Sequence, residues 1–463
     1  MLYAIRYMKL TFCGGAGAVT GANYLLEIAD PGVDGGIRKI LIDCGLSQGS
    51  HFLEELNYKP FGYDPAEISA VFVTHAHIDH SGKLPKLVKD GFKGAVYSTP
   101  PTKDFAELLL LDSQHILRQE GERIGRVALY EEKDIGDLML LWQGVEYHQQ
   151  ITLGDSIKVT LYSAGHILGS ASILIEAEGK KIIFSGDLGN QPAPLIGPAE
   201  CPTDVDYCLM ESAYGDRIHE DLDNRYQKLE RVIIETIKEG GVLMIPAFAL
   251  ERTQILLLEI HEMLDKHQIP PVPIYIDSPL AIKLTGVYNR YRSYLRPEIA
   301  QHFHGSDKVF SFPDLHMTLT TDESKAINHA GNPKIVIAGS GMSHAGRILH
   351  HELHNLSGPK NTLLIFGYQV EGSLGRRLLN GAKEVRILGQ EVRVKAHVRA
   401  IGAYSAHADQ RQLMNWVKPL SGRVKKVFLV QGEGSAATVL AGKLTNELKI
   451  PAEVPSLGDV VML

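Results

Sequence analysis

The chain has 463 residues, of which 44% are hydrophobic and 22% are charged. This length predicts two or more domains with substantial cores, and the composition is that of an ordinary soluble protein. The formal net charge of −7 and the pI near 6.3 argue against a protein that coats nucleic acid through a general basic surface. A local track of phosphate-binding residues remains compatible with this charge.

No apolar run reaches the roughly 18 to 20 residues that span a bilayer, and the first ten residues lack the apolar segment of a signal peptide. We therefore expect a cytoplasmic protein with no membrane partner. The four cysteines, Cys13, Cys44, Cys201 and Cys208, form no C-x-x-C pair. They predict reduced thiols and neither a zinc ribbon nor a disulfide framework.

The first part of the chain is typical of strands and hairpins, with a helix predicted at 102–122. The apolar stretch 68–74 ends in the sequence His-Ala-His-Ile-Asp-His at positions 75–80. Imidazole and carboxylate are zinc ligands, and four of them within six residues cannot all bind one tetrahedral ion. After a strand, His75 and His77 would point one way and Asp79 and His80 toward a neighbouring position. The sequence therefore predicts two metal ions; the alternative is a polar loop whose histidines only form hydrogen bonds.

Two later segments offer further ligands. His166 lies in a glycine-flanked loop between strand-like runs, and Asp187 ends the segment 181–187, whose apolar residues 182–184 predict a buried strand. Either residue alone would be more typical of a structural turn. Because a strong metal motif precedes them, we interpret both as ligands.

These segments resemble those of the metallo-β-lactamase superfamily. The resemblance implies that His75, His77 and His166 bind one zinc ion, that Asp79 and His80 bind the other, and that Asp187 bridges the two. It also implies that Asp43, which ends the apolar run 40–42, supports the ligand loop from behind.

From residue 208 onward, short apolar strands alternate with amphipathic helices. Strands are predicted at 208–211, 242–248, 334–338 and 362–366, and helices at 225–239, 252–266, 347–356 and 374–380. This alternation predicts a parallel, Rossmann-like sheet inserted into the first fold, to which the chain then returns. The predicted boundaries are 1–207 and 398–463 for the two parts of the metallo-β-lactamase domain and 208–397 for the insertion.

Two joints between strand and helix in the insertion are rich in glycine, at 339–347 and 367–377. Backbone amides at a helix start, with an arginine close behind, form a phosphate site. This interpretation assigns Ser340, Gly341, Arg347 and Arg376 to substrate phosphates. The alternative is that the glycines only permit tight turns and close packing.

The inserted domain and five further motifs resemble the β-CASP nucleases, and in particular their RNA-processing members. The motifs lie at 12–21, 211–217, 246–254, 340–342 and 404–409. The implied fold class is α/β: a metallo-β-lactamase αββα sandwich with an inserted Rossmann-like β-CASP domain. By position, Glu211 matches the acid of motif A and His407 the histidine of motif B, and Ser405 joins the residues expected to hold substrate phosphate. His397 competes with His407 but sits within a predicted strand.

One position departs from the family. Its RNA-processing members usually carry a histidine, the last ligand of the second zinc ion, where this chain has Gln431. A neutral amide oxygen is a weaker zinc ligand than imidazole. We therefore interpret Gln431 as a weak ligand, with the second ion more labile than the first.

The resemblance implies a zinc-dependent endoribonuclease that leaves 5′-phosphate and 3′-hydroxyl ends, and it leaves 5′-to-3′ trimming open. Asp79, Glu211 and His407 are the expected catalytic residues, two Zn²⁺ ions the expected cofactors with Mn²⁺ as a substitute, and single-stranded RNA the expected partner. A homodimer is left open. The alternatives are a small-molecule hydrolase of glyoxalase II or lactonase type, a catalytically weak scaffold, and a DNA-processing relative.

Overall fold

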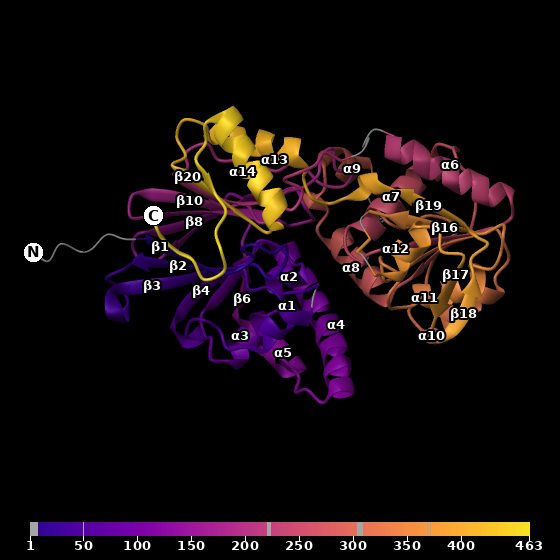
Figure 1. The fold of residues 1–463 in the computed structure, drawn as a ribbon, viewed down its shortest axis with the longest axis horizontal. Coiled ribbons are helices and arrows are strands. Elements are labelled where there is room, and N and C mark those ends of the chain that lie inside the picture. The colour runs from indigo at the N-terminus through magenta and orange to yellow at the C-terminus, as the bar shows by residue number, and fades with distance from the viewer. Residues whose placement is uncertain (1–7, 50, 220–223, 303–308, 368, 371) are drawn as a thin grey trace, which may run out of the picture. The chain divides into compact units, whose positions relative to one another are not determined.

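The computed structural model describes residues 8–49, 51–219, 224–302, 309–367, 369–370 and 372–463, and it divides into two compact units (Figure 1). Unit 1 comprises the chain up to Ile218 together with His407–Leu463, and unit 2 comprises His219–Ala406. Among the described residues, no helix is both long and apolar enough to cross a membrane.

Unit 1 contains two seven-stranded sheets. The first has the order β22-β1-β2-β3-β4-β5-β6 and the second β21-β20-β11-β10-β9-β8-β7. The strands of the first are β22 (Val460–Met462), β1 (Met8–Gly14), β2 (Asn23–Ala29), β3 (Ile37–Ile42), β4 (Ile68–Phe72), β5 (Ala95–Ser98) and β6 (Trp142–Gly144). The strands of the second are β21 (Ala452–Glu453), β20 (Lys426–Val430), β11 (Tyr207–Glu211), β10 (Lys180–Phe184), β9 (Ala171–Ala177), β8 (Ile157–Ser163) and β7 (Gln150–Leu153).

The two sheets pack face to face around one apolar core. Side chains from both sheets, such as Phe12, Phe72, Ile173 and Phe428, belong to the same buried cluster. Helices cover the outer faces (Figure 1). Those beside the first sheet are α1 (His51–Glu55), α2 (Ile78–Ser81), α3 (Leu84–Lys89), α4 (Pro100–Ile124) and α5 (Glu132–Leu141), and those beside the second are α13 (Gln410–Val417) and α14 (Gly434–Leu448). This is the αββα arrangement that the sequence predicts.

Local sequence explains where the long helix α4 begins and ends. The Thr99 hydroxyl accepts a hydrogen bond from the Thr102 amide, and proline follows at the first helical position. Gly125, with φ of 70°, ends the helix in the left-handed conformation that glycine adopts without a steric penalty. Helix α4 therefore extends slightly beyond the predicted 102–122 at both ends.

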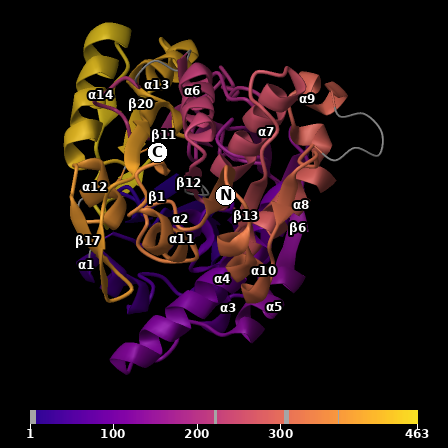
Figure 2. The ribbon, with the colours of Figure 1, turned by 90° about the vertical axis from the view of Figure 1, so that its right-hand side faces the viewer.

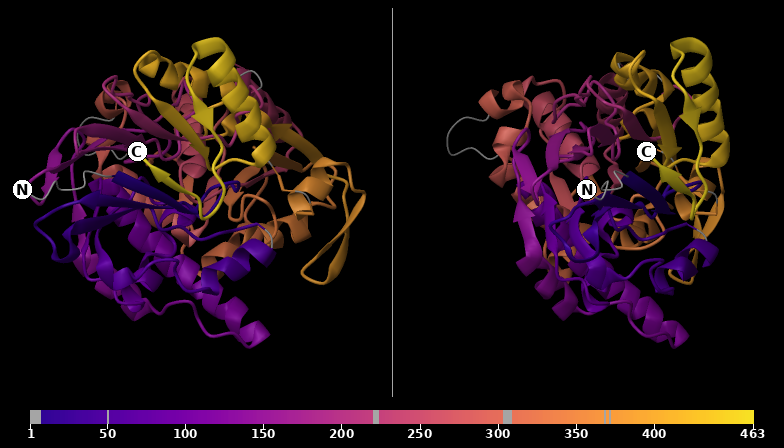
Figure 3. Two further views of the ribbon diagram at one scale, coloured as in Figure 1. Left: turned by 60° about the vertical axis from the view of Figure 1, so that its left-hand side comes forward. Right: turned by 90° about the vertical axis from the view of Figure 1, so that its left-hand side faces the viewer.

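The end of the chain completes the first sheet. Strand β22, at the C-terminal end of the chain, lies beside the N-terminal strand β1 (Figure 3) and pairs with it antiparallel. In this pairing Val461 lies opposite Leu10. The chain thus returns to unit 1 after unit 2, as expected for an insertion.

Unit 2 is built on a six-stranded parallel sheet with the order β14-β13-β15-β12-β16-β19. Its helices lie on both faces of this sheet (Figure 2). The strands are β12 (Val242–Pro246), β13 (Ile274–Asp277), β14 (Leu315–Met317), β15 (Lys334–Ala338), β16 (Thr362–Phe366) and β19 (His397–Ile401), with a hairpin of β17 (Glu384–Ile387) and β18 (Gln390–Arg393). The helices are α6 (Arg225–Lys238), α7 (Arg252–Asp265), α8 (Pro279–Arg290), α9 (Pro297–His302), α10 (Thr321–Ala326), α11 (Ile348–Asn355) and α12 (Leu374–Leu379).

The unit boundaries differ from those inferred from sequence. Strand β11, which the sequence placed at the start of the insertion, pairs with β10 and β20 inside unit 1. Strand β19, which was assigned mainly to the returning segment after 397, pairs with β16 in unit 2. Short apolar strands at a domain border look alike in sequence, and only their partners decide to which sheet they belong.

Candidate metal centre

The predicted ligands of unit 1 gather where strands of both sheets end. Strands β3 and β4 run parallel, as do β10, β11 and β20, so each set brings its carboxyl ends to one edge of its sheet. Asp43 follows β3, the run His75 to His80 follows β4, His166 lies between β8 and β9, Asp187 follows β10, Glu211 ends β11 and Gln431 follows β20.

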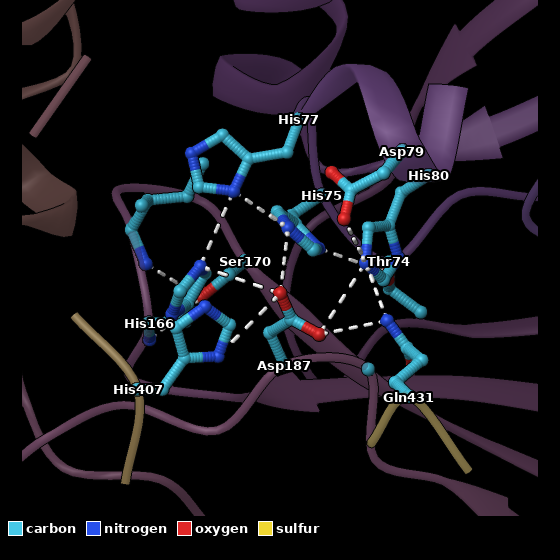
Figure 4. A network of polar contacts seen from close by, with 12 residues as sticks. Thr74, His75, His77, Asp79, His80, His166, Ser170, Asp187, His407 and Gln431 are labelled. Carbon is cyan, nitrogen blue, oxygen red and sulfur yellow. Dashed lines mark hydrogen bonds and ion pairs between the residues drawn. The ribbon is translucent and has the colours of Figure 1, made fainter. Parts of the chain in front are cut away.

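Three imidazoles and one carboxylate converge in a first cluster, formed by His75, His77, His166 and Asp187 (Figure 4). The His77 Nδ1 atom lies 3.0 Å from His75 Nε2 and 3.3 Å from His166 Nε2. The Asp187 Oδ2 atom lies 3.5 Å from His75 Nε2 and 3.6 Å from His166 Nε2. Ligands about 2.0 Å from a tetrahedral zinc ion stand about 3.3 Å apart, so these residues fit such an ion.

The protonation tendencies of the cluster also suit a cation. Burial, reinforced by the neighbouring His80, lowers the pKa of His75 well below its usual range, which favours the neutral ring that binds metals. Burial alone would raise the pKa of Asp187, but His80, His407 and His75 outweigh it and hold the pKa well below the ordinary value. Asp187 therefore stays a carboxylate.

The second cluster, Asp79 and His80 with Asp187, is looser. The His80 Nε2 atom lies 3.3 Å from Asp187 Oδ1 and 3.9 Å from Asp79 Oδ2. Within the described part of the chain, these three residues do not converge as closely as the four of the first cluster.

Asp43 contacts the loop that carries the predicted ligands. Its Oδ1 atom accepts a hydrogen bond from the Thr74 amide at 2.7 Å, and its Oδ2 atom lies 2.8 Å from both Thr74 Oγ1 and His80 Nδ1. This contact fixes the His80 ring with Nε2 turned toward Asp187. Sequence reasoning missed Thr74, although its position directly before His75 was a usable signal.

Gln431 reaches the second cluster from β20. Its side-chain Nε2 atom donates to Asp187 Oδ1 at 2.9 Å and lies 2.6 Å from His80 Nε2 (Figure 4). The side chain is buried. It is the amide nitrogen, and not the expected oxygen ligand, that faces the second position.

Glu211 and His407 form a carboxylate–imidazole pair beside the first cluster. The His407 Nδ1 atom lies 3.2 Å from Glu211 Oε2 and 3.8 Å from Asp187 Oδ2. Burial lowers the pKa of His407, but the charges of Glu211 and Asp187 outweigh burial and raise it to about 10. The backbone bridge between Gly189 and His407 places the ring here, a pairing that sequence could not reveal.

The residues predicted to hold phosphate belong to unit 2. A Cβ atom at Gly341 would lie 2.4 Å from the Phe248 ring, so close packing explains that glycine. The Arg347 guanidinium binds Asp277 Oδ1 at 2.7 Å and the Thr318 and Leu319 carbonyls, which ties it into the unit. In the structure the Arg347 guanidinium thus binds groups of unit 2, whereas the sequence predicted that it binds a substrate phosphate.

The other residues predicted to bind phosphate also lie in unit 2. The Ser340 hydroxyl accepts hydrogen bonds from the His344 and Ala345 amides at 3.3 Å. The Arg376 side chain, half-buried on α12, forms no hydrogen bond or ion pair with any residue the structure describes. Ser405 lies buried just before the end of unit 2. The competing His397 begins β19 in unit 2 and lies 3.5 Å from Glu239, so it takes no part in the unit 1 clusters.

Comparison with protein families agrees with this geometry. Residues 32–239 match the metallo-beta-lactamase superfamily, residues 253–378 the Beta-Casp domain, and residues 391–455 the Zn-dependent metallo-hydrolase RNA specificity domain. The chain belongs to the β-CASP family. The metallo-β-lactamase match spans the ligand loops, and the Beta-Casp match lies within unit 2 of this β-CASP protein.

Relatives of this β-CASP chain cover nearly its whole length. Ribonuclease TTHA0252 from Thermus thermophilus is 37% identical over 94% of the chain and 96% of its own length. An RNase J-like protein from Methanocaldococcus jannaschii is 33% identical over 91% of the chain and 94% of its own length. Transcription termination factor FttA from Methanosarcina mazei is 31% identical over 96% of the chain and 70% of its own length.

A solved structure shares the fold. A protein of unknown function from Enterococcus faecalis V583 superposes with a TM-score of 0.59 at 14% identity, covering 99% of this chain and all of that one. This likeness concerns the fold alone.

Proposed function

We propose that this β-CASP protein is a metal-dependent ribonuclease that cleaves single-stranded RNA internally and leaves 5′-phosphate and 3′-hydroxyl ends. The observation that carries the proposal is the Glu211–His407 pair, 3.2 Å apart, beside the cluster of His75, His77, His166 and Asp187. Relatives named ribonuclease and RNase J-like, aligned over nearly the full chain, support RNA as the substrate.

The donor set supports zinc. Three imidazoles and a carboxylate are the borderline ligands that zinc accepts, and Mn²⁺ is the natural substitute where carboxylates dominate. His75, His77, His166 and Asp187 would hold one ion, and Asp79, His80 and the shared Asp187 a second. When bound, such ions neutralise the charge that develops on the phosphate and lower the pKa of a water molecule to near neutrality.

The chain's own residues would handle the proton of the leaving group. Glu211 accepts a hydrogen bond from the Leu188 amide through Oε1, which fixes the carboxylate while Oε2 faces His407. This contact orients the imidazole through Nδ1, so its Nε2 atom is the one that would donate a proton to the departing 3′ oxygen. Asp187 would keep its charge because the imidazoles hold its pKa down.

A substrate panel tests the proposal. The substrate is an RNA without internal base pairing, labelled at either end. We expect the protein to cleave this RNA and to leave 5′-phosphate groups on the new fragments. A DNA strand of the same sequence should remain intact. Fragments appearing at intermediate lengths from both labels indicate internal cleavage, whereas release of single nucleotides from the 5′ end indicates trimming. Hydrolysis of a thiolester or lactone without any RNA cleavage would overturn the proposal in favour of a small-molecule hydrolase, and equal cleavage of the DNA strand would overturn RNA specificity.

A further inference from the structure

We propose that the Gln431 side-chain amide competes with the second metal ion for His80 and Asp187, and is not a weak ligand of that ion. The inference rests on the metal dependence proposed above, and it concerns metal binding alone. It gives the protein one tightly held ion and a second that must displace a hydrogen-bonded amide.

The chemistry of the two partners fixes which amide atom faces the second position. Asp187 Oδ1 is a carboxylate oxygen that only accepts hydrogen bonds, so the atom 2.9 Å from it must be the NH₂ group. His80 Nδ1 lies 2.8 Å from Asp43 Oδ2, so this nitrogen is engaged by the carboxylate. The other ring nitrogen, Nε2, is the atom that a metal ion would bind, and Gln431 Nε2 lies 2.6 Å from it.

The distance between the Gln431 amide and His80 argues that the amide is a competitor of the second ion and not its ligand. Two ligands of one tetrahedral zinc ion stand about 3.3 Å apart, as do His80 Nε2 and Asp187 Oδ1 at 3.3 Å. Gln431 Nε2 approaches His80 Nε2 to 2.6 Å, which is closer than two ligands of one ion stand. The amide thus contacts the same two atoms that the second ion would bind.

The backbone holds Gln431 in this position. Its own N–H donates to the Gly15 carbonyl at 2.6 Å, and its φ of 49° lies in the left-handed region. The side chain is buried. Asp79, at 3.9 Å from His80 Nε2, does not close the second set around an ion by itself.

The two roles predict opposite effects of removing the amide. If Gln431 competes, Gln431→Ala should tighten the second ion about tenfold or more, because the amide no longer occupies the space beside His80 Nε2 and no longer donates a hydrogen bond to Asp187 Oδ1. If Gln431 is a ligand, the same change should weaken that ion. Gln431→Gly is the companion variant, because glycine tolerates the positive φ that strains alanine, and Gln431→His, which supplies an imidazole, is the positive control for tightening.

The measurement is a titration of the metal-free full-length protein with Co²⁺, followed by its visible absorption, and with Zn²⁺, followed by metal analysis after desalting. We expect the unaltered protein to retain one equivalent after desalting, and the alanine, glycine and histidine variants to retain a second. A second ion that is weaker or unchanged in both the alanine and glycine variants would overturn the proposal, as would two equally tight ions in the unaltered protein. None of these readouts depends on RNA cleavage, so failure of the proposed function leaves the result interpretable.

Discussion

Asp187 belongs to both candidate metal clusters. Its Oδ2 atom faces His75 and His166, while its Oδ1 atom faces His80 and Gln431. Burial in the carboxyl end of the second sheet would normally raise the pKa of such a carboxyl, and only the surrounding imidazoles keep it charged. The same carboxylate also lies 3.8 Å from His407, so it links metal binding to the proposed proton donor.

We expect Glu211 to shift the pH dependence of RNA cleavage, because it changes the pKa of His407. Its charge helps to raise the pKa of His407 to about 10, so Glu211→Gln should lower that pKa. A proton donor is active below its pKa, and the high-pH fall in cleavage rate should therefore begin at lower pH in the variant. We expect a loss of about a hundredfold in rate with unchanged metal content, measured as a pH–rate profile beside metal analysis. Glu132→Gln, on the exposed start of α5, is the matched control. An unshifted profile would contradict the role given to Glu211.

Glu352 should make the stability of unit 2 depend on pH. This buried carboxyl on α11 accepts a hydrogen bond from Ser343, and burial raises its pKa from 4.5 to about 8. The folded protein therefore keeps a proton that the unfolded chain releases, so this contribution to stability is full below pH 4.5 and is lost as the pH rises through about 8.

Urea unfolding of the whole protein at several pH values measures this contribution. We expect the unaltered protein to lose stability relative to Glu352→Gln as the pH rises across that window, because the amide cannot ionise. A constant difference between the two proteins from pH 4.5 to pH 9 would show that Glu352 does not titrate in this range.

At the level of helices and strands, close packing explains the glycines at the joints between strand and helix in unit 2. Strands β12, β15 and β16 are parallel neighbours, so the joints that follow them lie at one edge of the sheet. Gly341 lies against Phe248, and a Cβ atom at Gly367 would lie 2.9 Å from the Arg252 guanidinium. Close approach of the chain is thus required at these joints whether or not phosphate binds there.

Two arginines at these joints should behave differently. Arg376→Ala should weaken RNA binding and reduce the salt dependence by about 0.7 in the log–log slope, because this guanidinium has no partner among the described residues. Arg347→Ala should instead destabilise unit 2, because it leaves the buried Asp277 without its 2.7 Å ion pair. RNA affinity at several salt concentrations and urea unfolding of both variants make the comparison. Loss of stability with Arg376→Ala, or normal stability and weakened RNA binding with Arg347→Ala, would contradict these assignments.

Local periodicity was sufficient to predict strands β12, β15 and β16 and helices α6, α7, α11 and α12 of unit 2, but not β13, β14, the β17–β18 hairpin or helices α8, α9 and α10. The helices predicted at 225–239, 252–266 and 374–380 correspond to α6, α7 and α12 within a residue or so at their ends. The strands β11 and β19 were assigned to the other unit, because strand pairing depends on residues distant in sequence. Amphipathic spacing determines a helix locally, whereas membership of a sheet is a non-local property.

At the scale of the whole chain, the candidate centre combines residues from Asp43 to Gln431 that lie at five different strand ends and in two loops of unit 1. The metal motif at 75–80 could be recognised because its ligand types are dense in sequence. Three other features could not be recognised from sequence, because each depends on a neighbour that is distant in the chain. They are the contacts of Thr74, the Gly189–His407 bridge and the orientation of the Gln431 amide. Sequence alone therefore identified the residues of the candidate centre but not the contacts among them.

Metal dependence is tested most directly by measuring metal content and RNA cleavage on the same preparations. The unaltered protein is stripped with a chelator, analysed for metal, assayed on end-labelled single-stranded RNA, and assayed again after Zn²⁺ or Mn²⁺ is restored. We predict that the metal-free protein cleaves at least about a thousandfold more slowly, that restored metal recovers the rate, and that Asp187→Ala stays folded but recovers neither metal nor activity. Full cleavage of RNA by the metal-free protein would contradict the claim that the cluster of His75, His77, His166 and Asp187 holds the ion on which cleavage depends.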